Sequence, residues 1–260
     1  MFFRLLGAGL LWTAPLAALA GQSVADHVSM GSAAIEAHDL RTGLAHFDAA
    51  LALDSSDYAA NWRAAVALLD QGQQIPDSIK SSERDSLYAR AEVLARRAVA
   101  ADSMGPEGHF AVAASVGLAS LTRGKQARIR RARIVHDEAL RTLQLDPDYD
   151  GAYHVLGRWN AEIMRLSGIS RFFAKRFLGA GIFGQASWEQ AIANLQRAVQ
   201  LDPARISHRL ELARIYADRK RYQEARDQLA RIGALPDREL LDPLYREQAA
   251  GLAKRIADKE

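Results

Sequence analysis

The chain has 260 residues, of which 49% are hydrophobic and 25% are charged, so it is long enough to bury one large core or two smaller ones. Its 34 basic and 31 acidic residues give a formal net charge of +3, an excess too small to indicate a polyanion as partner. The absence of cysteine excludes disulfides, thiolate metal sites and a lipid-modified N-terminal cysteine.

The first twenty residues have the pattern of a secretory signal peptide. A single early cation precedes an apolar run, and the small residues Ala18 and Ala20 lead to a cleavage position before Gly21. The apolar run is shorter than the roughly 20 residues that a membrane-spanning helix needs. We therefore expect a signal peptide at 1–20, a mature domain at 21–260, and export of the protein to the periplasm.

Apolar residues recur three or four positions apart along the rest of the chain, which is the spacing of amphipathic helices. No stretch alternates polar and apolar residues as half-buried strands do. The periodicity predicts helices at 26–37, 41–53, 57–71, 84–101, 106–122, 125–145, 204–218, 221–231 and 239–257. Taken two at a time these helices form pairs, and the last one suits the cap of a helical array.

Helical units end at recurring aspartates, which are Asp54, Asp102, Asp146 and Asp202. Proline follows the last two of them and cannot continue a helix. Between these two stops, Gly157, Ala191 and Ala198 match the small positions at which tetratricopeptide helices meet. The next unit matches the same template in register at Leu212, Ala213, Tyr216, Tyr222 and Ala225. We expect an all-α, tetratricopeptide-like α-solenoid of about five helix pairs with a C-terminal capping helix.

The unit before Pro203 contains an insertion, at 165–186, between its two helices. Within it, apolar residues form one helical stripe with basic residues beside them. This predicted amphipathic helix contains Ile169, Phe172, Phe173, Lys175, Arg176 and Phe177. Such a helix either packs on its own solenoid or lies on a membrane surface or a partner protein.

Motifs of catalysis are missing from the sequence. Gly179 to Gly184 fits the glycine pattern of dinucleotide sites, but a helix-like segment precedes it where that fingerprint needs a strand, so we interpret it as a hinge. The seven histidines include no pair at i and i+4, and neither a nucleophile elbow nor a phosphate-binding loop occurs. We expect a protein that is not an enzyme and binds no cofactor or metal.

Six basic residues and no acidic residue lie between Arg123 and Arg133. Aromatic side chains, on which bases would stack, do not interleave with them. We interpret this run as a solvated helix face, with contact to anionic lipid or an acidic protein as the alternative. Nucleic acid is not an expected partner.

Repeats of this kind line a concave surface with the first helix of each pair. The template positions predict a groove with an apolar half and a polar half, lined by Trp62, Leu118, Leu121, His154, Arg158 and Arg214. We expect a scaffold that holds a protein or peptide segment there. The alternative is a phospholipid, with its acyl chains near the two leucines and its head group at either arginine.

From Gly108 to Ala250 the chain resembles the regulator of microtubule dynamics family. The resemblance rests on Gly124-Lys-x-x-x-Ile, on His154-Val-Leu-Gly-Arg-Trp and on Arg171-x-x-Ala-Lys-x-Phe-Leu. It implies an adaptor fold whose eukaryotic members associate with microtubules or organelle membranes, including contact sites with lipid-handling roles. Because an exported protein would not meet microtubules, we transfer the fold and the mode of binding but not that partner.

Overall fold

The structure is a computed structural model that describes residues 21–76, 79–121, 125–166 and 184–260, without the side chains of 121–129. Its ordered elements are α-helices, and these ranges contain no strand. The helices are α1 (Val24–Glu36), α2 (Leu40–Leu53), α3 (Tyr58–Gln73), α4 (Ser82–Ala101), α5 (Pro106–Leu121), α6 (Lys125–Leu145), α7 (Asp150–Arg165), α10 (Trp188–Leu201), α11 (Ile206–Asp218), α12 (Tyr222–Ala234) and α13 (Asp242–Ile256).

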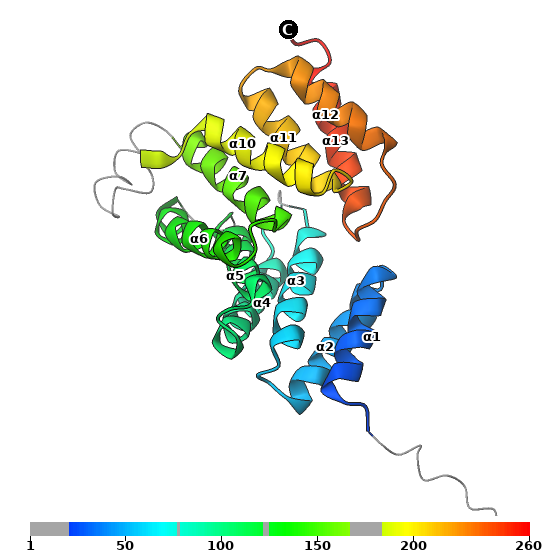
Figure 1. Ribbon diagram of the computed structural model, residues 1–260. Coiled ribbons are helices and arrows are strands. Elements are labelled where there is room, and N and C mark those ends of the chain that lie inside the picture. The colour runs from blue at the N-terminus through cyan, green and yellow to red at the C-terminus, as the bar shows by residue number, and fades with distance from the viewer. Residues whose placement is uncertain (1–20, 77–78, 122–124, 167–183) are drawn as a thin grey trace, which may run out of the picture.

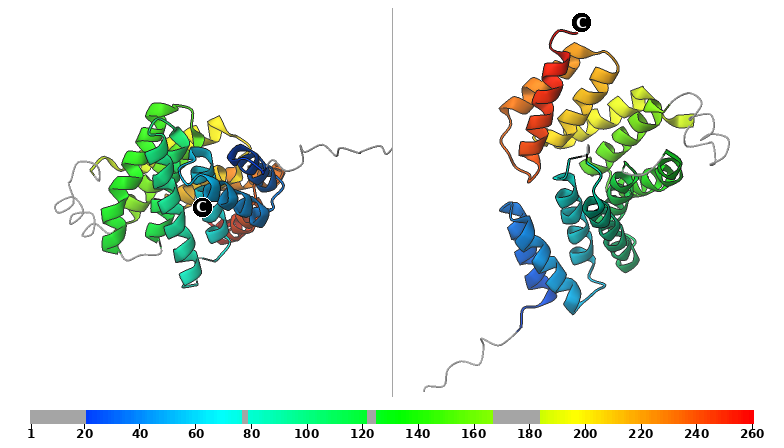
Figure 2. Two further views of the ribbon diagram at one scale, coloured as in Figure 1. Left: turned by 90° about the horizontal axis from the view of Figure 1, so that it is seen from below. Right: turned by 180° about the vertical axis from the view of Figure 1, so that it is seen from behind.

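The helices pack in pairs, and the pairs stack side by side into a curved array (Figure 1). The pairs are α1 with α2, α3 with α4, α5 with α6, α7 with α10, and α11 with α12. The last helix, α13, packs against both α11 and α12. Figure 2 shows the stack from below and from behind. The predicted tetratricopeptide-like α-solenoid is confirmed.

The curvature brings the two ends of the array together. The ring nitrogen Nε2 of His38, after α1, lies 3.2 Å from the backbone oxygen of Arg238, before α13. The Tyr245 hydroxyl of α13 donates a hydrogen bond of 3.4 Å to Gln73 Oε1 at the end of α3. The solenoid therefore makes a nearly closed turn, with its inner face between the two ends (Figure 1).

The four aspartates that the sequence marks as helix stops share one geometry. Each backbone N–H donates to the carbonyl oxygen four residues back, the last such bond of its helix. Each carboxylate then accepts a backbone N–H from two residues further on, at 2.8 to 3.1 Å. This turn satisfies the amide groups that follow the helix and directs the chain into the next pair.

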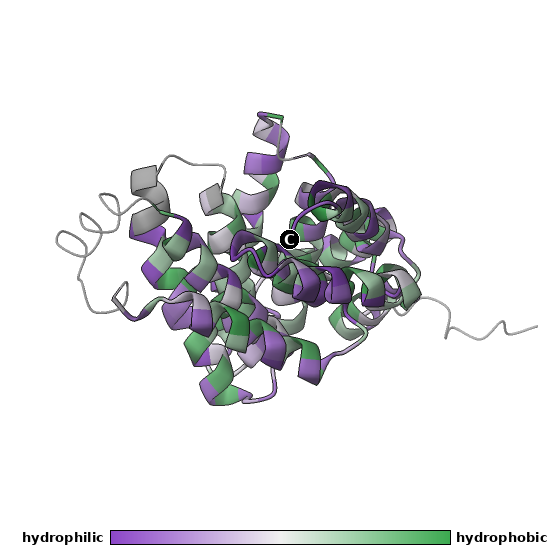
Figure 3. Cartoon of the chain, turned by 90° about the horizontal axis from the view of Figure 1, so that it is seen from above, coloured by the Kyte–Doolittle hydropathy of each residue, from purple (hydrophilic) through white to green (hydrophobic). Residues whose placement is uncertain are grey.

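Small residues allow the two helices of a pair to approach closely. A Cβ atom added to Gly157 of α7 would lie 2.5 Å from Leu195 Cγ and 3.2 Å from the Ala191 carbonyl oxygen, both on α10. Gly72 of α3 has the same role, since a Cβ there would lie 2.4 Å from the Tyr88 ring of α4. Each helix carries hydrophobic and hydrophilic residues together (Figure 3), so the apolar side of each can pack in the core.

The start of the capping helix differs from its sequence-based prediction. The pattern places it at residue 239, but α13 begins at Asp242, with proline in its first turn. The Asp242 carboxylate accepts the backbone N–H groups of Arg238 and Glu239, each at 2.8 Å. These bonds hold the three residues before the helix in a separate turn.

Several predictions from the sequence fall outside the described residues. They are the signal peptide at 1–20, the glycine hinge from Gly179 onward except for its last residue Gly184, and the amphipathic helix of the insertion. The described chain ends α7 at Arg165 and begins α10 at Trp188, on either side of the insertion. Among the described helices, none has both the length and the apolar character needed to span a bilayer.

Replacement of Gly157 by alanine tests the close approach of α7 and α10. We expect Gly157→Ala to lower the free energy of unfolding by about 1–3 kcal/mol, because the new methyl group overlaps Leu195. Gly251→Ala in α13 is the matched control, since its Cβ would meet nothing within 4 Å. That control gains about 0.5–1 kcal/mol from helix propensity. Urea denaturation measures both, and equal gains in the two variants would contradict the packing described here.

Candidate functional site

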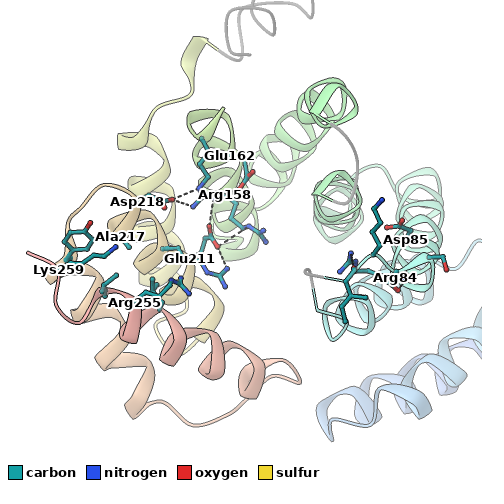
Figure 4. A pocket seen from close by; sticks show the side chains of 18 residues that line it. Arg84, Asp85, Arg158, Glu162, Glu211, Ala217, Asp218, Arg255 and Lys259 are labelled. Atoms are coloured by element: carbon teal, nitrogen blue, oxygen red, sulfur yellow. Dashed lines mark hydrogen bonds and ion pairs between the residues drawn. The ribbon is translucent and has the colours of Figure 1, made fainter. Parts of the chain in front are cut away.

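A cavity of about 1200 Å³ lies on the inner face of the solenoid (Figure 4). One wall is formed by α7, α11 and α13, and the other by the segment 79–85, which includes the start of α4. These walls come from repeats that are far apart in the sequence. The shape of the cavity therefore depends on the curvature of the whole stack.

Ionisable side chains line the facing sides of α7 and α11. They recur every three or four residues, the spacing that places side chains on one face of a helix. On α7 they are Asp150, His154, Arg158, Glu162 and Arg165, and on α11 they are His208, Glu211, Arg214 and Asp218. Together they form a polar network along the inside of the curve.

Glu211 is the centre of this network. Its side chain is only 5% exposed, and the guanidinium groups of Arg158, Arg165 and Arg214 lie 3.9, 3.8 and 3.1 Å from its carboxylate oxygens. Burial alone would raise the pKa of Glu211, but the three arginines outweigh this effect and hold the pKa below its ordinary value. The carboxylate is thus charged at neutral pH and gathers three cations around itself.

The three arginines differ in how fully they are engaged. Arg165 donates to Asp218 at 2.6 and 2.9 Å and to Glu162 at 2.7 Å. Arg214 donates to Glu211 and to Gln248 of α13. A guanidinium group has five N–H donors, so Arg214, and Arg158 with its long contact to Glu211, keep donors that a ligand can use.

Two histidines and an aspartate continue the network toward the start of α7. His154 Nδ1 lies 2.9 Å from His208 Nδ1, and His208 Nε2 lies 2.8 Å from Asp150 Oδ2. Burial is the main reason why the pKa of His154 lies well below its ordinary value, and the charges of His208 and of nearby arginines lower it further. A bond between two ring nitrogens requires one of them to accept, and the uncharged His154 fits that requirement.

Asp150 stays ionised for a similar reason. Burial would raise its pKa, but the hydrogen bond from His208 and the charge of Arg205 lower the pKa to about 2. Arg205 also donates to Glu239, which lies in the loop before α13. The start of α7 is therefore tied to α11 and to the loop before the capping helix.

The opposite wall of the cavity is held by Arg84 of α4. Its guanidinium group donates to the carbonyl oxygens of Pro76 at 2.8 Å and Ile79 at 2.9 Å. Arg84 is itself buried, so its charge fixes the loop between α3 and α4. The loop in turn places Ile79 and Lys80 at the cavity.

Basic side chains outnumber acidic ones around the cavity. The α7 and α11 wall supplies three cations, Arg158, Arg165 and Arg214. The opposing segment and the chain from α13 onward supply four more, Lys80, Arg84, Arg255 and Lys259. Four carboxylates stand against these seven: Asp85, Glu162, Glu211 and Asp218. The cavity is positive by about three charges in its described lining, which favours an anionic ligand.

A further acidic residue, Asp70 of α3, is close to charges from the far end of the solenoid. Burial and the negative charge of Glu239 raise the pKa of Asp70 to about 7, and Arg205 acts in the opposite direction. Burial likewise raises the pKa of Tyr245, with Asp70 among the charges around it. Asp70 therefore lies at the closure between the N-terminal and C-terminal repeats.

The structure brings together part of the predicted groove. Arg158 and Arg214 line the cavity, and His154 lies one turn before Arg158 on the same face of α7. Trp62 and Leu118 are half-buried against the N-terminal core and do not line the cavity. The side chain of Leu121 lies outside the described residues, as does the insertion stripe of Ile169, Phe172, Phe173, Lys175, Arg176 and Phe177.

Sequence reasoning missed several residues that shape the cavity, among them Glu211, Lys80 and Arg255. Glu211 occupies a buried position of α11 between Leu210 and Leu212, and an acid between two apolar residues is the signal that could have identified it. Lys80 lies in the loop before α4, and Arg255 lies in a helix that also contains Arg246 and Lys254. Nothing local distinguishes these two from ordinary surface residues.

The described part of the basic run has structural contacts. Arg131 forms an ion pair with Glu92 of α4 and donates to Ser120 of α5. Arg133 pairs with Asp137 one turn on in α6. The side chains of the run's earlier residues, up to 129, lie outside the described residues. In the described residues, no group of three or more His, Cys, Asp or Glu side chains could hold a metal ion.

Removal of the Glu211 charge should destabilise the folded protein, because three guanidinium groups would lose their shared counter-ion. We expect Glu211→Gln to lower the free energy of unfolding by about 3 kcal/mol. Glu224→Gln, which breaks an exposed pair with Arg221, is the control and should cost less than about 1 kcal/mol. Similar losses in both variants, measured by denaturant titration, would show that Glu211 does not organise the site.

Asp70 should make stability fall with rising pH. Its pKa is raised in the folded state, so its contribution is complete below about pH 4 and is lost as the pH rises through about 7. We expect Asp70→Asn to remove this decline, so that the variant is the more stable protein at pH 8. Thermal melts of both proteins between pH 5 and pH 8 measure the slope, and parallel curves would exclude a shifted Asp70.

A family model described as regulator of microtubule dynamics protein 1-3 matches residues 31–257. No curated protein matches the chain in sequence. Among solved structures, the chain is similar to TTC0263, a thermophilic tetratricopeptide repeat protein from Thermus thermophilus, with a TM-score of 0.64 at 16% identity. That match covers 89% of this chain and 100% of the other.

A second similar structure is that of PilF from Pseudomonas aeruginosa, with a TM-score of 0.52 and 14% identity over 90% of each chain. At these identities the two structures support the tetratricopeptide-like fold alone. The family model covers nearly the whole described chain, including α7 and α11 with their charged network. The protein therefore belongs to the regulator of microtubule dynamics protein 1-3 family.

Proposed function

We propose that this protein is a non-catalytic scaffold that holds a segment of another protein in the groove of its inner face. The cavity of about 1200 Å³ between α7, α11, α13 and segment 79–85 carries this proposal. It is larger than the roughly 300–1,000 Å³ of typical small-molecule sites. One wall is formed by helices that pack on their neighbours, and the loop of the other wall is held by Arg84. Fixed walls suit the binding of a partner segment without large rearrangement.

The arginine side chains that line the cavity are suited to binding a partner segment. Arg158, Arg165 and Arg214 are gathered by Glu211, so their guanidinium groups are oriented before a partner arrives. Fixed donors lose little side-chain entropy on binding. We propose that the partner meets these groups after export of the protein, in keeping with the signal sequence expected at 1–20.

A phospholipid is the second candidate, because the positive lining also suits a phosphate head group. Arg158 and Arg214 would bind that group. Leu118, proposed here to hold acyl chains, packs against the N-terminal core instead of lining the cavity. We favour a peptide because the leucine assigned to the acyl chains lies away from the cavity.

Filling the groove tests the proposal. Ala217 of α11 lines the cavity, so we expect Ala217→Trp to weaken peptide binding by about tenfold or more, since the indole occupies the volume a partner needs. Ala230→Trp on the exposed side of α12 is the matched control and should bind as the unaltered protein does. Peptides selected from a displayed random library on the full chain provide the ligands, and fluorescence anisotropy gives their affinities.

Two outcomes would contradict the proposal. If both tryptophan variants bind the selected peptides equally well, the peptides bind elsewhere on the molecule. If no peptide is selected and native mass spectrometry finds phospholipid on the purified protein but not on Ala217→Trp, the groove is a lipid site.

A further inference from the structure

We propose that the groove selects acidic segments, and that Lys80 and Arg255 are the residues that distinguish them from neutral ones. This inference rests on the proposed peptide-binding function and names the chemistry of its partner. The cavity is lined by two kinds of cation: some form ion pairs with carboxylates of the protein, and others do not. The inference follows from this difference.

The α7 and α11 side of the cavity is internally compensated. Arg165 has Asp218 and Glu162 as partners, and Glu211 serves all three arginines of that wall. Glu211 is the buried member of this set, at 5% exposure, and each arginine around it already has a carboxylate partner. These residues therefore provide a fixed surface on which three cations are balanced by three carboxylates.

Lys80 and Arg255 have a different environment. Both line the cavity and both are exposed. Within the described chain neither forms an ion pair or a side-chain hydrogen bond, although Asp85 and Glu162 line the same cavity. Unpaired cations keep their full attraction for a ligand carboxylate. They stand on separate elements, the loop before α4 and the helix α13, so they meet a bound chain at two separate points.

The arrangement of these elements fits an extended chain or a short helix. Figure 4 shows the segment with Arg84 and Asp85 on one side of the cavity and Arg158, Glu211 and Arg255 on the other. A segment bound between them has cations on both sides. Its carboxylates would meet Lys80 on one wall and Arg255 on the other.

An apolar contact accompanies the positive charge. Ile79, next to Lys80, lines the cavity and is 54% exposed. On the other wall the Tyr222 ring lies under the Lys259 ammonium group, 5.7 Å from its centroid. An acidic segment that also carries an apolar or aromatic residue fits both features.

The same features disfavour a nucleic acid or a bilayer as the occupant. Asp85, Glu162 and Asp218 interleave with the cations and would repel a continuous row of phosphates. A planar bilayer surface cannot follow the concave inner face on which Arg158 and Arg214 lie. A peptide with separated carboxylates can place each of them beside a cation and away from the groove's own acids.

The test uses two fluorescein-labelled peptides of about 15 residues. One has glutamates spaced among leucine, serine and tyrosine, and the other has glutamine at every glutamate position. We expect the full-length protein to bind the first at least about tenfold more tightly than the second, with an affinity that falls as salt is raised. Fluorescence anisotropy gives both affinities.

Reversing the charge of single residues tests which of them cause the preference for the acidic peptide. We expect Arg255→Glu to weaken binding of the acidic peptide about tenfold or more, because a nearby attraction becomes a repulsion, and to leave the glutamine peptide unaffected. Lys254→Glu makes the same charge change one residue earlier in α13, at an exposed position that does not line the cavity, and should have little effect. Lys80→Glu repeats the test from the other wall, and circular dichroism confirms that each variant is folded.

The outcomes separate the two proposals. Equal binding of the acidic and glutamine peptides would overturn the acidic preference and leave the peptide groove in place. Equal losses in Arg255→Glu and Lys254→Glu would show that overall charge, and not the cavity, attracts the peptide. If neither peptide binds while vesicles containing phosphatidylglycerol do, both the peptide-binding function and its acidic preference are wrong.

Discussion

Close contact between paired helices is the constraint on which this structure depends. At Gly157 the α7 backbone lies so near Leu195 and Ala191 that a single added carbon would overlap them. Such contacts set the distance between helices, and repeated along the array they set its curvature. Because the curve nearly closes, His38 reaches the backbone before α13. The groove is therefore a consequence of packing distances in the core.

The inner face carries a network of ionised groups with the buried Glu211 at its centre. Burying Glu211 is unfavourable by itself, and its three arginines offset that cost only because they are held in contact with it. The resulting network holds Arg158, Arg165 and Arg214 in fixed positions on the wall of the cavity. Its histidine pair, His154 and His208, and Asp150 extend it to the start of α7. The same side chains thus stabilise neighbouring repeats and present fixed donors to the cavity.

The closure between the two ends gives the groove its second wall. The hydrogen bond from Tyr245 to Gln73 joins the capping helix to α3. Asp70 of α3 lies near enough to Glu239 for that carboxylate to raise its pKa. Arg84 then holds the loop that faces α11 and α13. An open solenoid of the same helices would expose α7 and α11 as one side of a shallow surface. The near-closed turn converts that surface into a cavity with cations on both sides.

The sequence by itself determined the helical repeats, since helix periodicity, the four closing aspartates and small residues such as Gly157 are local signals. It also identified Arg158 and Arg214 as inner-face residues, because the repeat template fixes which positions of a first helix face inward. It did not reveal the partners of Glu211, or that Lys80 and Arg255 line one cavity. Those two residues are 175 positions apart in the numbering. Each helix pair is rotated slightly relative to the one before it, and only the curvature that builds up over all the intervening pairs brings these two residues to one cavity. No local sequence pattern specifies that curvature.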